Sequence, residues 1–192
     1  TQILPTTLKV ILKEVKKDME QKKKYYRLLQ RGYMEFPKKT YKIIYADPPY
    51  YFKNWNKDNS NIKRGIPPYP TMNDEDIKNL PVQDIAHKNC VLFIWVTYPK
   101  LLSGIETIKS WGFEYKTCAF SWVKQNKKSD GLYMGMGYWT RANNEICLLA
   151  TKGNPKRISA SVRQIVLERV REHSRKPDCV RDRIVELCGD LP

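Results

Sequence analysis

The order of apolar and polar positions after residue 40 predicts strands that alternate with helices. Tyr41–Ala46 and Cys90–Thr97 are apolar runs, and the second is typical of a strand that is buried on both faces. Lys100–Trp111 has helical periodicity, and Gly112 ends it. This alternation predicts an α/β fold with a mostly parallel sheet and helices on both faces.

The rest of the chain contributes further elements and two long polar loops. Three more strands and two more helices are predicted at Tyr115–Val123, Glu145–Thr151 and Gln164–Glu168, near Thr71–Pro81, and at Pro177–Leu187. The segments Phe52–Tyr69 and Lys124–Gly137 are long for connections in a compact domain, and loops of that length are usually functional or disordered. We expect the first to act as a lid, because it leaves directly from the end of the first strand.

Residues 1–36 differ from the α/β pattern of residues 37–192 and predict a basic helical extension. An apolar stripe recurs there at helical spacing, at Leu8, Ile11, Leu12, Val15 and Met19. Residues 1–42 hold 12 basic and 4 acidic side chains, so this stretch carries +8 of the net charge of +15. Two interpretations remain open: an arm that touches phosphates, or an amphipathic helix with a solvated lysine face.

Composition narrows the class of partner. The 192 residues suffice for one domain with a sizeable core, and the net charge of +15 indicates a polyanion, nucleic acid before membrane. The alternative is a lysine-rich protein without such a partner. The longest apolar run, Val91–Val96, is too short to span a bilayer, so no membrane partner is expected. The five cysteines form no CxxC pair; we expect no metal site, and a reducing cytosol or nucleus.

The first strand runs into a rigid turn, Asp47-Pro48-Pro49-Tyr50. Two prolines cannot continue a strand, because each lacks a backbone donor and fixes its own φ. Asp47 could accept one N–H of an exocyclic amine, and the Pro48 carbonyl the other, which would aim the nitrogen lone pair at a methyl donor. Tyr50 could stack on the base. The plain alternative is a strand-ending turn in which Asp47 is a local cap.

Several motifs in order resemble one family of enzymes. Besides Ile43–Tyr50 they are Tyr69–Met72, Leu92–Val96, Trp111–Phe113, Trp122–Lys124, Gly137–Asn154 and Glu172–Asp178. Over about residues 41–188 the chain resembles the adenine-N6 methyltransferases related to the catalytic subunit of the eukaryotic messenger-RNA adenosine methyltransferase. It is most similar to their compact bacterial and phage members. The resemblance implies a Rossmann-like methyltransferase fold and S-adenosylmethionine as cofactor.

The resemblance also implies roles for single residues. The catalytic turn would be Asp47, Pro48, Pro49 and Tyr50. The cofactor would contact Ala46, Asp47, Pro48, His173, Ser174 and Lys176, with Lys176 on the methionine carboxylate, where a cation just before a helix start suits an anion. The substrate would contact Tyr50, Asn54, Lys124, Arg141, Asn143 and Asn144. One departure is expected to matter: the family continues into a strand that forms much of the adenosyl pocket, whereas this sequence stops at Pro192 and is expected to be an incomplete copy.

The favoured interpretation is an adenine-N6 methyltransferase that prefers DNA, with RNA as the alternative substrate. A non-catalytic nucleic-acid-binding subunit is the second interpretation. Methylation of a free amine, as on the glutamine of a protein, is the third, and Asp47 in place of the Asn of an NPPY turn disfavours it. By analogy we expect a homodimer or a related methyltransferase subunit as partner. The expected location is the cytoplasm of a bacterial or phage-infected cell, or the nucleus if the source is eukaryotic.

Overall fold

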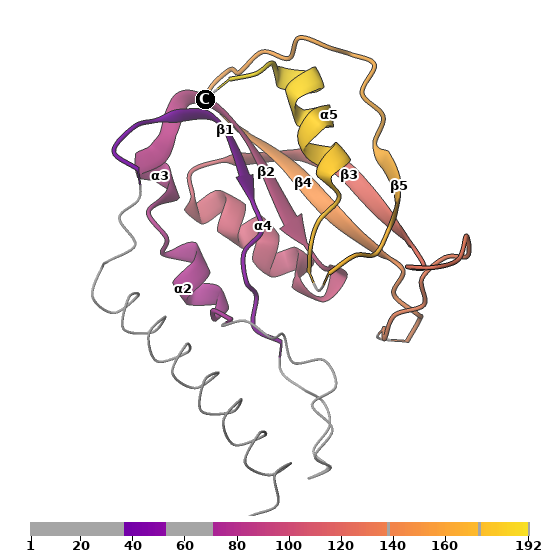
Figure 1. The fold of residues 1–192 in the computed structure, drawn as a ribbon. Coiled ribbons are helices and arrows are strands. Elements are labelled where there is room, and N and C mark those ends of the chain that lie inside the picture. Colours follow the sequence, from indigo (N-terminus) through magenta and orange to yellow (C-terminus); the bar gives the residue numbers. More distant parts are fainter. Residues whose placement is uncertain (1–36, 53–70, 138, 173, 192) are drawn as a thin grey trace, which may run out of the picture. The chain divides into compact units, whose positions relative to one another are not determined.

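The computed structural model describes residues 37–52, 71–137, 139–172 and 174–191 (Figure 1). The predicted extension 1–36 and nearly all of the predicted lid lie outside these ranges. The described elements, in chain order, are β1 (Tyr41–Ala46), α2 (Asp74–Lys78), α3 (Val82–Ile85), β2 (Ala86–Val96), the 3₁₀ helix η1 (Tyr98–Lys100), α4 (Leu101–Ser110), β3 (Glu114–Gln125), β4 (Asn144–Lys152), β5 (Ile165–Arg169) and α5 (Asp178–Cys188). Every strand predicted from the apolar pattern is confirmed, while α3 and η1 were not predicted.

The five strands form one sheet in the order β1-β2-β4-β3-β5. Strand β1 pairs with β2, and β3 with β5, in parallel, whereas β4 pairs antiparallel with both β2 and β3. The prediction of a mostly parallel sheet is therefore confirmed in part: β1, β2, β3 and β5 run in one direction, and the reversed strand β4 makes the sheet mixed. The apolar pattern could not reveal this, because a buried strand has the same run of residues in either direction. The carboxyl ends of β1, β2, β3 and β5 still meet at one edge, together with the amino end of β4.

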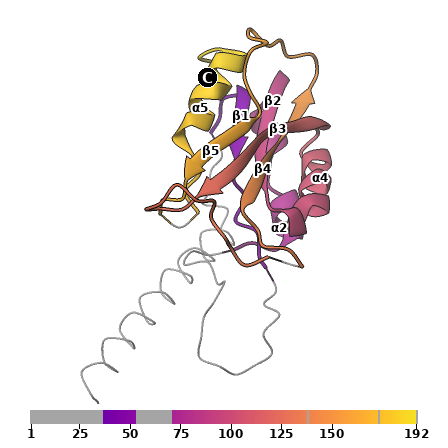
Figure 2. The same ribbon diagram turned by 90° about the vertical axis from the view of Figure 1, so that its right-hand side faces the viewer.

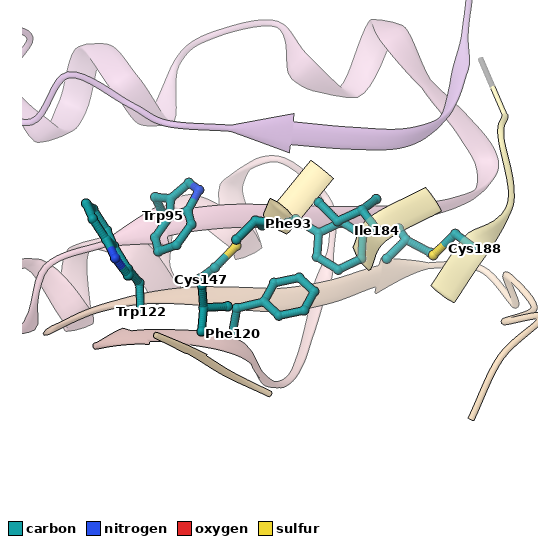
Figure 3. Packing of buried hydrophobic residues seen from close by; sticks show 10 residues of the cluster. Phe93, Trp95, Phe120, Trp122, Cys147, Ile184 and Cys188 are labelled. Carbon is teal, nitrogen blue, oxygen red and sulfur yellow. The ribbon is translucent and has the colours of Figure 1, made fainter. Parts of the chain in front are cut away.

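Helices cover both faces of this sheet, as predicted: α5 packs on one face and α4 on the other (Figure 2). On the α5 face, the core joins aromatic rings of β2 and β3 to aliphatic side chains of α5 (Figure 3). Phe93 stacks on Phe120 with ring centroids 6.0 Å apart, and Trp95 meets Trp122 edge-on at 6.4 Å. Val180 and Ile184 of α5 close this cluster. Burial of such rings dominates the stability of a small core.

On the opposite face, α4 lies close against strand β2, which lies between β1 and β4 in the sheet. Gly104 permits this approach, since a Cβ at this position would overlap the Val96 side chain. Ile108 is fully buried, and the Trp111 indole donates to the Ile77 carbonyl oxygen over 3.0 Å, which ties α4 to α2. The helix ends where Gly112 takes a φ of 75°, as the sequence predicted. Strand β2 is thus buried on both faces from Cys90 to Val96.

The cysteines belong to this core. Cys90, Cys147 and Cys188 are buried as free thiols, and Cys118 and Cys179 are half-buried. In the part of the chain that the structure describes, no three His, Cys, Asp or Glu side chains gather as metal ligands. No helix within the described ranges has the length and apolar character to cross a membrane.

Candidate active site

The candidate catalytic residues meet on the side of the sheet where the carboxyl ends of β1, β2, β3 and β5 lie. We call this side the carboxyl edge and the opposite side the amino edge. Asp47 follows β1, Lys124 lies at the end of β3, and Lys176 follows β5 just before α5. Glu145 lies at the amino end of β4, which reaches the same edge because β4 runs in the opposite direction. Open α/β sheets bind their ligands at this edge.

Backbone hydrogen bonds hold the Asp47–Tyr50 turn. The Tyr50 amide donates to the Pro48 carbonyl oxygen over 2.9 Å, and the Met72 amide donates to the Pro49 carbonyl oxygen over 2.8 Å. The Pro48 oxygen keeps a second lone pair, so it can still accept from a ligand. The Asp47 side chain is 43% exposed at the tip of this fixed turn. A carboxylate is therefore presented to solvent on a rigid support.

Four charged side chains alternate in sign beside the turn. The Lys176 ammonium lies 2.8 Å from the Asp47 carboxylate and 3.5 Å from the Glu145 carboxylate. Glu145 also receives the Lys124 ammonium at 2.6 Å. Lys124, Glu145 and Lys176 are 17%, 20% and 13% exposed, so only Asp47 faces solvent freely. We call these four residues the charged cluster.

Burial and neighbouring charges shift the pKa values of Lys176, Glu145 and Asp47 in the charged cluster. Burial lowers the pKa of Lys176, but Glu145 and Asp47 outweigh it and the net pKa is raised. Burial raises the pKa of Glu145, but Lys176 and Lys124 outweigh it and the net pKa is lowered. For Asp47, partial burial prevails over the opposing Lys176 ammonium, and the pKa lies above its ordinary value. The surroundings thus favour the ionised forms of Lys176 and Glu145 but not that of Asp47.

Aromatic residues form the floor beneath Lys176. Its ammonium lies 5.6 Å from the centre of the Trp95 ring, within cation–π range. The Trp95 indole donates to the Tyr45 hydroxyl over 2.6 Å, and burial raises the pKa of Tyr45. Sequence reasoning did not single out Glu145, Trp95 or Tyr45. Their chemistry was hidden in apolar strand runs, and no local signal distinguishes an inward Trp of the core from one below a cation.

The loop before α5 is braced so that Lys176 points to Asp47. Arg171 contacts Asp178 at 2.6 Å and donates to the Lys176 carbonyl oxygen over 2.9 Å. Arg175 adds a second contact to Asp178 at 3.1 Å. Ser174 takes a φ of 63°, and its carbonyl oxygen accepts from the Lys176 ammonium over 3.4 Å. The Arg171–Asp178 pair is a positioning feature that the sequence motif did not reveal.

Tyr50 is placed differently from the expectation that it stacks on a base. Its ring is 6% exposed, and its hydroxyl would lie 3.6 Å from a Cβ built on Gly104 of α4. Within the described residues this buried hydroxyl has no hydrogen-bond partner. Stacking of Tyr50 on a base therefore requires the ring to leave this position, and the expectation stays a prediction.

Four of the other predicted site residues lie at the strand ends near the charged cluster, and two lie outside the described residues. Ala46 ends β1 and pairs with Ile94. The Asn143 carbonyl oxygen accepts from the Lys124 amide over 2.8 Å, and the Asn144 side chain donates to the Tyr98 hydroxyl over 2.8 Å. These contacts hold the ends of β3 and β4 together, and Arg141 lies exposed beside them. Asn54 and His173 lie outside the described residues.

The structure thus defines an α/β protein with a mixed sheet, whose candidate site lies where ligands bind in open α/β sheets. Comparison with known proteins assigns the family. The MT-A70 family model matches residues 41–191, which include the Asp47 turn and the whole charged cluster. The chain therefore belongs to the MT-A70 family.

Individual relatives carry names from two branches. The chain is 34% identical over 175 residues to the Type II methyltransferase M.MunI of a Mycoplasma species, covering 83% of this chain and 72% of that protein. It is 31% identical over 140 residues to the N(6)-adenosine-methyltransferase MT-A70-like protein of Arabidopsis thaliana, covering 72% of this chain. It is 29% identical over 147 residues to the human N(6)-adenosine-methyltransferase catalytic subunit METTL3, covering 76% of this chain.

These comparisons confirm the family that the motifs predicted, a family of methyltransferases with N6-adenosine methylation among its named activities. The chain spans only 18% of the Arabidopsis protein and 23% of the human protein. Its similarity to those proteins is thus confined to a part of each. Members of the family generally use S-adenosylmethionine. The names from the two branches leave the choice between DNA and RNA open.

Proposed function

We propose that this protein transfers a methyl group from S-adenosylmethionine to the N6 amine of adenine in nucleic acid, with DNA as the preferred substrate. The observation that carries the proposal is the charged cluster. The half-exposed Asp47 carboxylate stands on a rigid turn, with Lys176 2.8 Å away. A carboxylate acceptor beside a fixed cation suits an amine substrate and a cofactor that bears both charges.

Asp47 orients the acceptor amine. An adenine amine is a weak nucleophile, because its lone pair is delocalised into the ring. Asp47 accepts one N–H, and the free lone pair of the Pro48 carbonyl accepts the other, so the nitrogen becomes more tetrahedral. Positioning of this kind supplies a large part of the rate enhancement in such reactions. The nitrogen gains the methyl group and loses a proton to solvent, and a strong base is not required.

The residues present fit the cofactor. S-adenosylmethionine, when bound, supplies an activated methyl on a cationic sulfur, and it also carries a carboxylate and an ammonium group. Lys176 would hold the carboxylate, while Asp47 and Glu145 would offset the positive charges. Burial lowers the Lys176 pKa, but the Glu145 and Asp47 carboxylates outweigh it and raise the pKa in net, which keeps the lysine cationic for this task. Ala46, Pro48 and Ser174 remain proposed cofactor contacts.

Sequence identity and coverage both support DNA over RNA. The relative with the higher identity, the Mycoplasma Type II methyltransferase, is also matched over 72% of its length, whereas the human adenosine methyltransferase is matched over 23%. The net charge of +15 suits either polyanion. RNA adenosine methylation is the alternative. A non-catalytic subunit is the second candidate, which the intact Asp47 turn disfavours.

The test is transfer of labelled methyl from S-adenosylmethionine to DNA and RNA oligonucleotides of the same sequence. Product nucleosides are identified by mass spectrometry. We expect N6-methyladenine in DNA from the wild type, and a loss of at least about 100-fold in Asp47→Asn. Asp84→Asn is the control. This carboxylate is exposed on α3, which directly precedes the amino end of β2, so the variant should retain activity. If methyl is transferred to RNA alone, the substrate is RNA and not DNA. If the protein binds both nucleic acids but methylates neither, the non-catalytic subunit is favoured.

A further inference from the structure

Two tryptophans of the core each lie beneath one lysine of the charged cluster. The Lys176 ammonium lies 5.6 Å from the centre of the Trp95 ring in β2. The Lys124 ammonium lies 4.9 Å from the centre of the Trp122 ring in β3. Glu145 contacts both lysines, at 2.6 Å from Lys124 and 3.5 Å from Lys176. Each ammonium thus contacts a carboxylate and lies over an indole ring, within cation–π range.

The two indole rings differ in the acceptor for their N–H group. Trp122 donates to the backbone carbonyl oxygen of Glu168 over 3.0 Å. Trp95 donates to the side-chain hydroxyl of Tyr45 over 2.6 Å. A backbone acceptor is present whatever side chain the residue carries, whereas a hydroxyl acceptor depends on the side chain itself. The hydrogen bond that orients Trp95 can therefore be removed by a single substitution, and that of Trp122 cannot.

Tyr45 is placed to fix the Trp95 ring. It lies near the end of β1, on the same face as Ile43, which packs against the core beneath α5. Tyr45 is 41% exposed, whereas Trp95 is 1% exposed. An indole N–H at that depth has no access to water, and a buried donor without a partner is costly. The hydrogen bond to Tyr45 therefore holds the Trp95 ring in one orientation.

The orientation of the ring matters to the lysine above it. The face of an indole ring is negative and its edge is positive, so only the face attracts an ammonium group. Rotation of Trp95 would bring the positive edge beneath Lys176. The ammonium would then be held by its contacts with Asp47 at 2.8 Å and Glu145 at 3.5 Å alone, without support from below. The Tyr45 hydroxyl thus acts on Lys176 through Trp95.

We propose that Tyr45 is a positioning residue: its hydroxyl orients Trp95, and the face of Trp95 holds the Lys176 ammonium where it receives the carboxylate of the cofactor. The role of that carboxylate rests on the proposed function, whereas the positioning of Lys176 does not. Tyr45 takes no part in the chemical step. Its removal should therefore weaken cofactor binding and leave the rate of methyl transfer at saturation unchanged.

The first experiment measures the reactivity of lysines in the ligand-free protein. Wild type and Tyr45→Phe are treated with a trace of acetic anhydride, and acetylation at each lysine is quantified by mass spectrometry. An amine reacts only in its neutral form, which the carboxylates of Asp47 and Glu145 disfavour while they hold the ammonium of Lys176. We expect the rate at Lys176 to rise about 2- to 30-fold in Tyr45→Phe, the range for loss of one cation–π contact.

Lys124 is the control within the same protein. Its supporting ring, Trp122, keeps a backbone acceptor in Tyr45→Phe, so its acetylation rate should stay within about 2-fold of the wild-type rate. A general loosening of the core would raise the rates at Lys124 and Lys176 together. The loss of a positioning contact raises the rate at Lys176 alone.

A double-mutant cycle tests whether the effect passes through the indole N–H. Trp95→Phe keeps an aromatic ring but has no N–H group that needs an acceptor. It should raise the rate at Lys176 by itself, because a phenyl face attracts cations less than an indole face does. Addition of Tyr45→Phe should then change that rate by less than about 2-fold. Additive effects of the two substitutions would mean that Tyr45 does not act through Trp95, and would overturn the inference.

The second experiment asks which part of the cofactor the effect reaches. Calorimetric titrations compare S-adenosylmethionine with its decarboxylated analogue, which lacks the group that Lys176 is proposed to hold. Tyr45→Phe should weaken binding of S-adenosylmethionine about 2- to 30-fold and leave the affinity for the analogue unchanged. In methyl-transfer assays, KM for the cofactor should rise by a similar factor, with kcat within about 2-fold of the wild type.

Three results would contradict the positioning role. They are equal acetylation of Lys176 in wild type and Tyr45→Phe, a parallel rise at Lys124, and an equal loss of affinity for S-adenosylmethionine and its decarboxylated analogue. Failure of the proposed function has a different signature. A selective rise at Lys176 in Tyr45→Phe, together with no binding of S-adenosylmethionine by the wild type, would reject the cofactor and leave the positioning of Lys176 by Tyr45 in place.

Discussion

The amino edge and the carboxyl edge of the sheet differ in the groups that satisfy their polar atoms. At the amino edge, neutral groups satisfy the strand ends. The Asn154 amide donates to the Asn89 side chain over 3.0 Å, and the Gln83 side chain donates to the Ser110 carbonyl oxygen over 2.7 Å. Gly153 takes a φ of 65° in the turn after β4. The Asn89 amide also donates to the His87 ring over 3.1 Å. Side-chain amides, backbone groups and one histidine ring thus close this edge.

The carboxyl edge instead retains half-buried charges. Lys176 and Glu145 are 13% and 20% exposed, yet both remain ionised through their mutual contacts and those with Asp47 and Lys124. Removing charges from water costs several kcal/mol per ion before the partners compensate. Clusters of half-buried charges are frequent at functional sites, which supports the candidate site at this edge.

The largest test of this contrast is Lys176→Met, with Lys88→Met at the amino edge as its partner. Lys176→Met should lower methyl transfer about 100-fold, because a buried cation with charged hydrogen bonds to two carboxylates is lost. Lys88 is exposed, and its replacement should leave the rate unchanged. Initial rates at saturating DNA, with circular dichroism to verify folding, measure both. Equal rates for the two variants would mean that the carboxyl edge is not catalytic.

Glycine substitutions test whether packing at the two ends has different consequences. A Cβ on Gly104 would overlap Val96 and lie 3.6 Å from the Tyr50 hydroxyl, while one on Gly153 would overlap the Lys88 backbone. Gly104→Ala and Gly153→Ala should each lower the free energy of unfolding by about 1–3 kcal/mol in urea titrations. Only Gly104→Ala should also lower the transfer rate per folded molecule, since it displaces the catalytic turn. A similar transfer rate for both variants would mean that the position of Tyr50 does not affect catalysis.

Glu145→Gln tests the electrostatic account through pH. The folded-state pKa of Glu145 is lowered from 4.5, so its stabilisation is present above pH 4.5 and is lost as the pH falls through the lower folded value. The unfolding free energy of Glu145→Gln should lie about 1–2 kcal/mol below that of the wild type at pH 7. The gap should close in strong acid. The control is Glu114→Gln at the amino edge, where the carboxylate is 76% exposed and little change is expected.

The smallest expected effect concerns an ion pair that borders the charged edge without belonging to the charged cluster. Lys100 contacts Asp74 at 2.8 Å, and their side chains are 18% and 33% exposed. Lys100→Ala should cost about 0.5–1 kcal/mol of unfolding free energy at low salt, and less at high salt. Lys116→Ala, which breaks an exposed pair with Glu114, should cost less still. A cost above 2 kcal/mol for Lys100→Ala would extend the charged cluster to the start of α4.

The element pattern was predictable because burial fixes it locally. The run Tyr41–Ala46 became β1 with the predicted bounds, and Cys90–Val96 is the doubly buried part of β2. The predicted Lys100–Trp111 helix became α4, shorter at each end. Strand direction was not predictable, since apolar runs carry no polarity. The mostly parallel sheet inferred from alternation therefore describes β1, β2, β3 and β5 but not β4.

The candidate site divides in the same way. The sequence by itself determined the Asp47 turn, because a double proline after an apolar run has a meaning that depends on near neighbours alone. Lys176 was singled out only by the resemblance of its motif to a known family. Only the tertiary structure brought Glu145 and Trp95 to Lys176, and turned the Tyr50 ring into the interior. Those contacts join residues far apart in the chain, and the reversed direction of β4 selects them. The sequence thus identified the polar and charged groups of the turn, and the arrangement of strands in the sheet determined which other groups they contact.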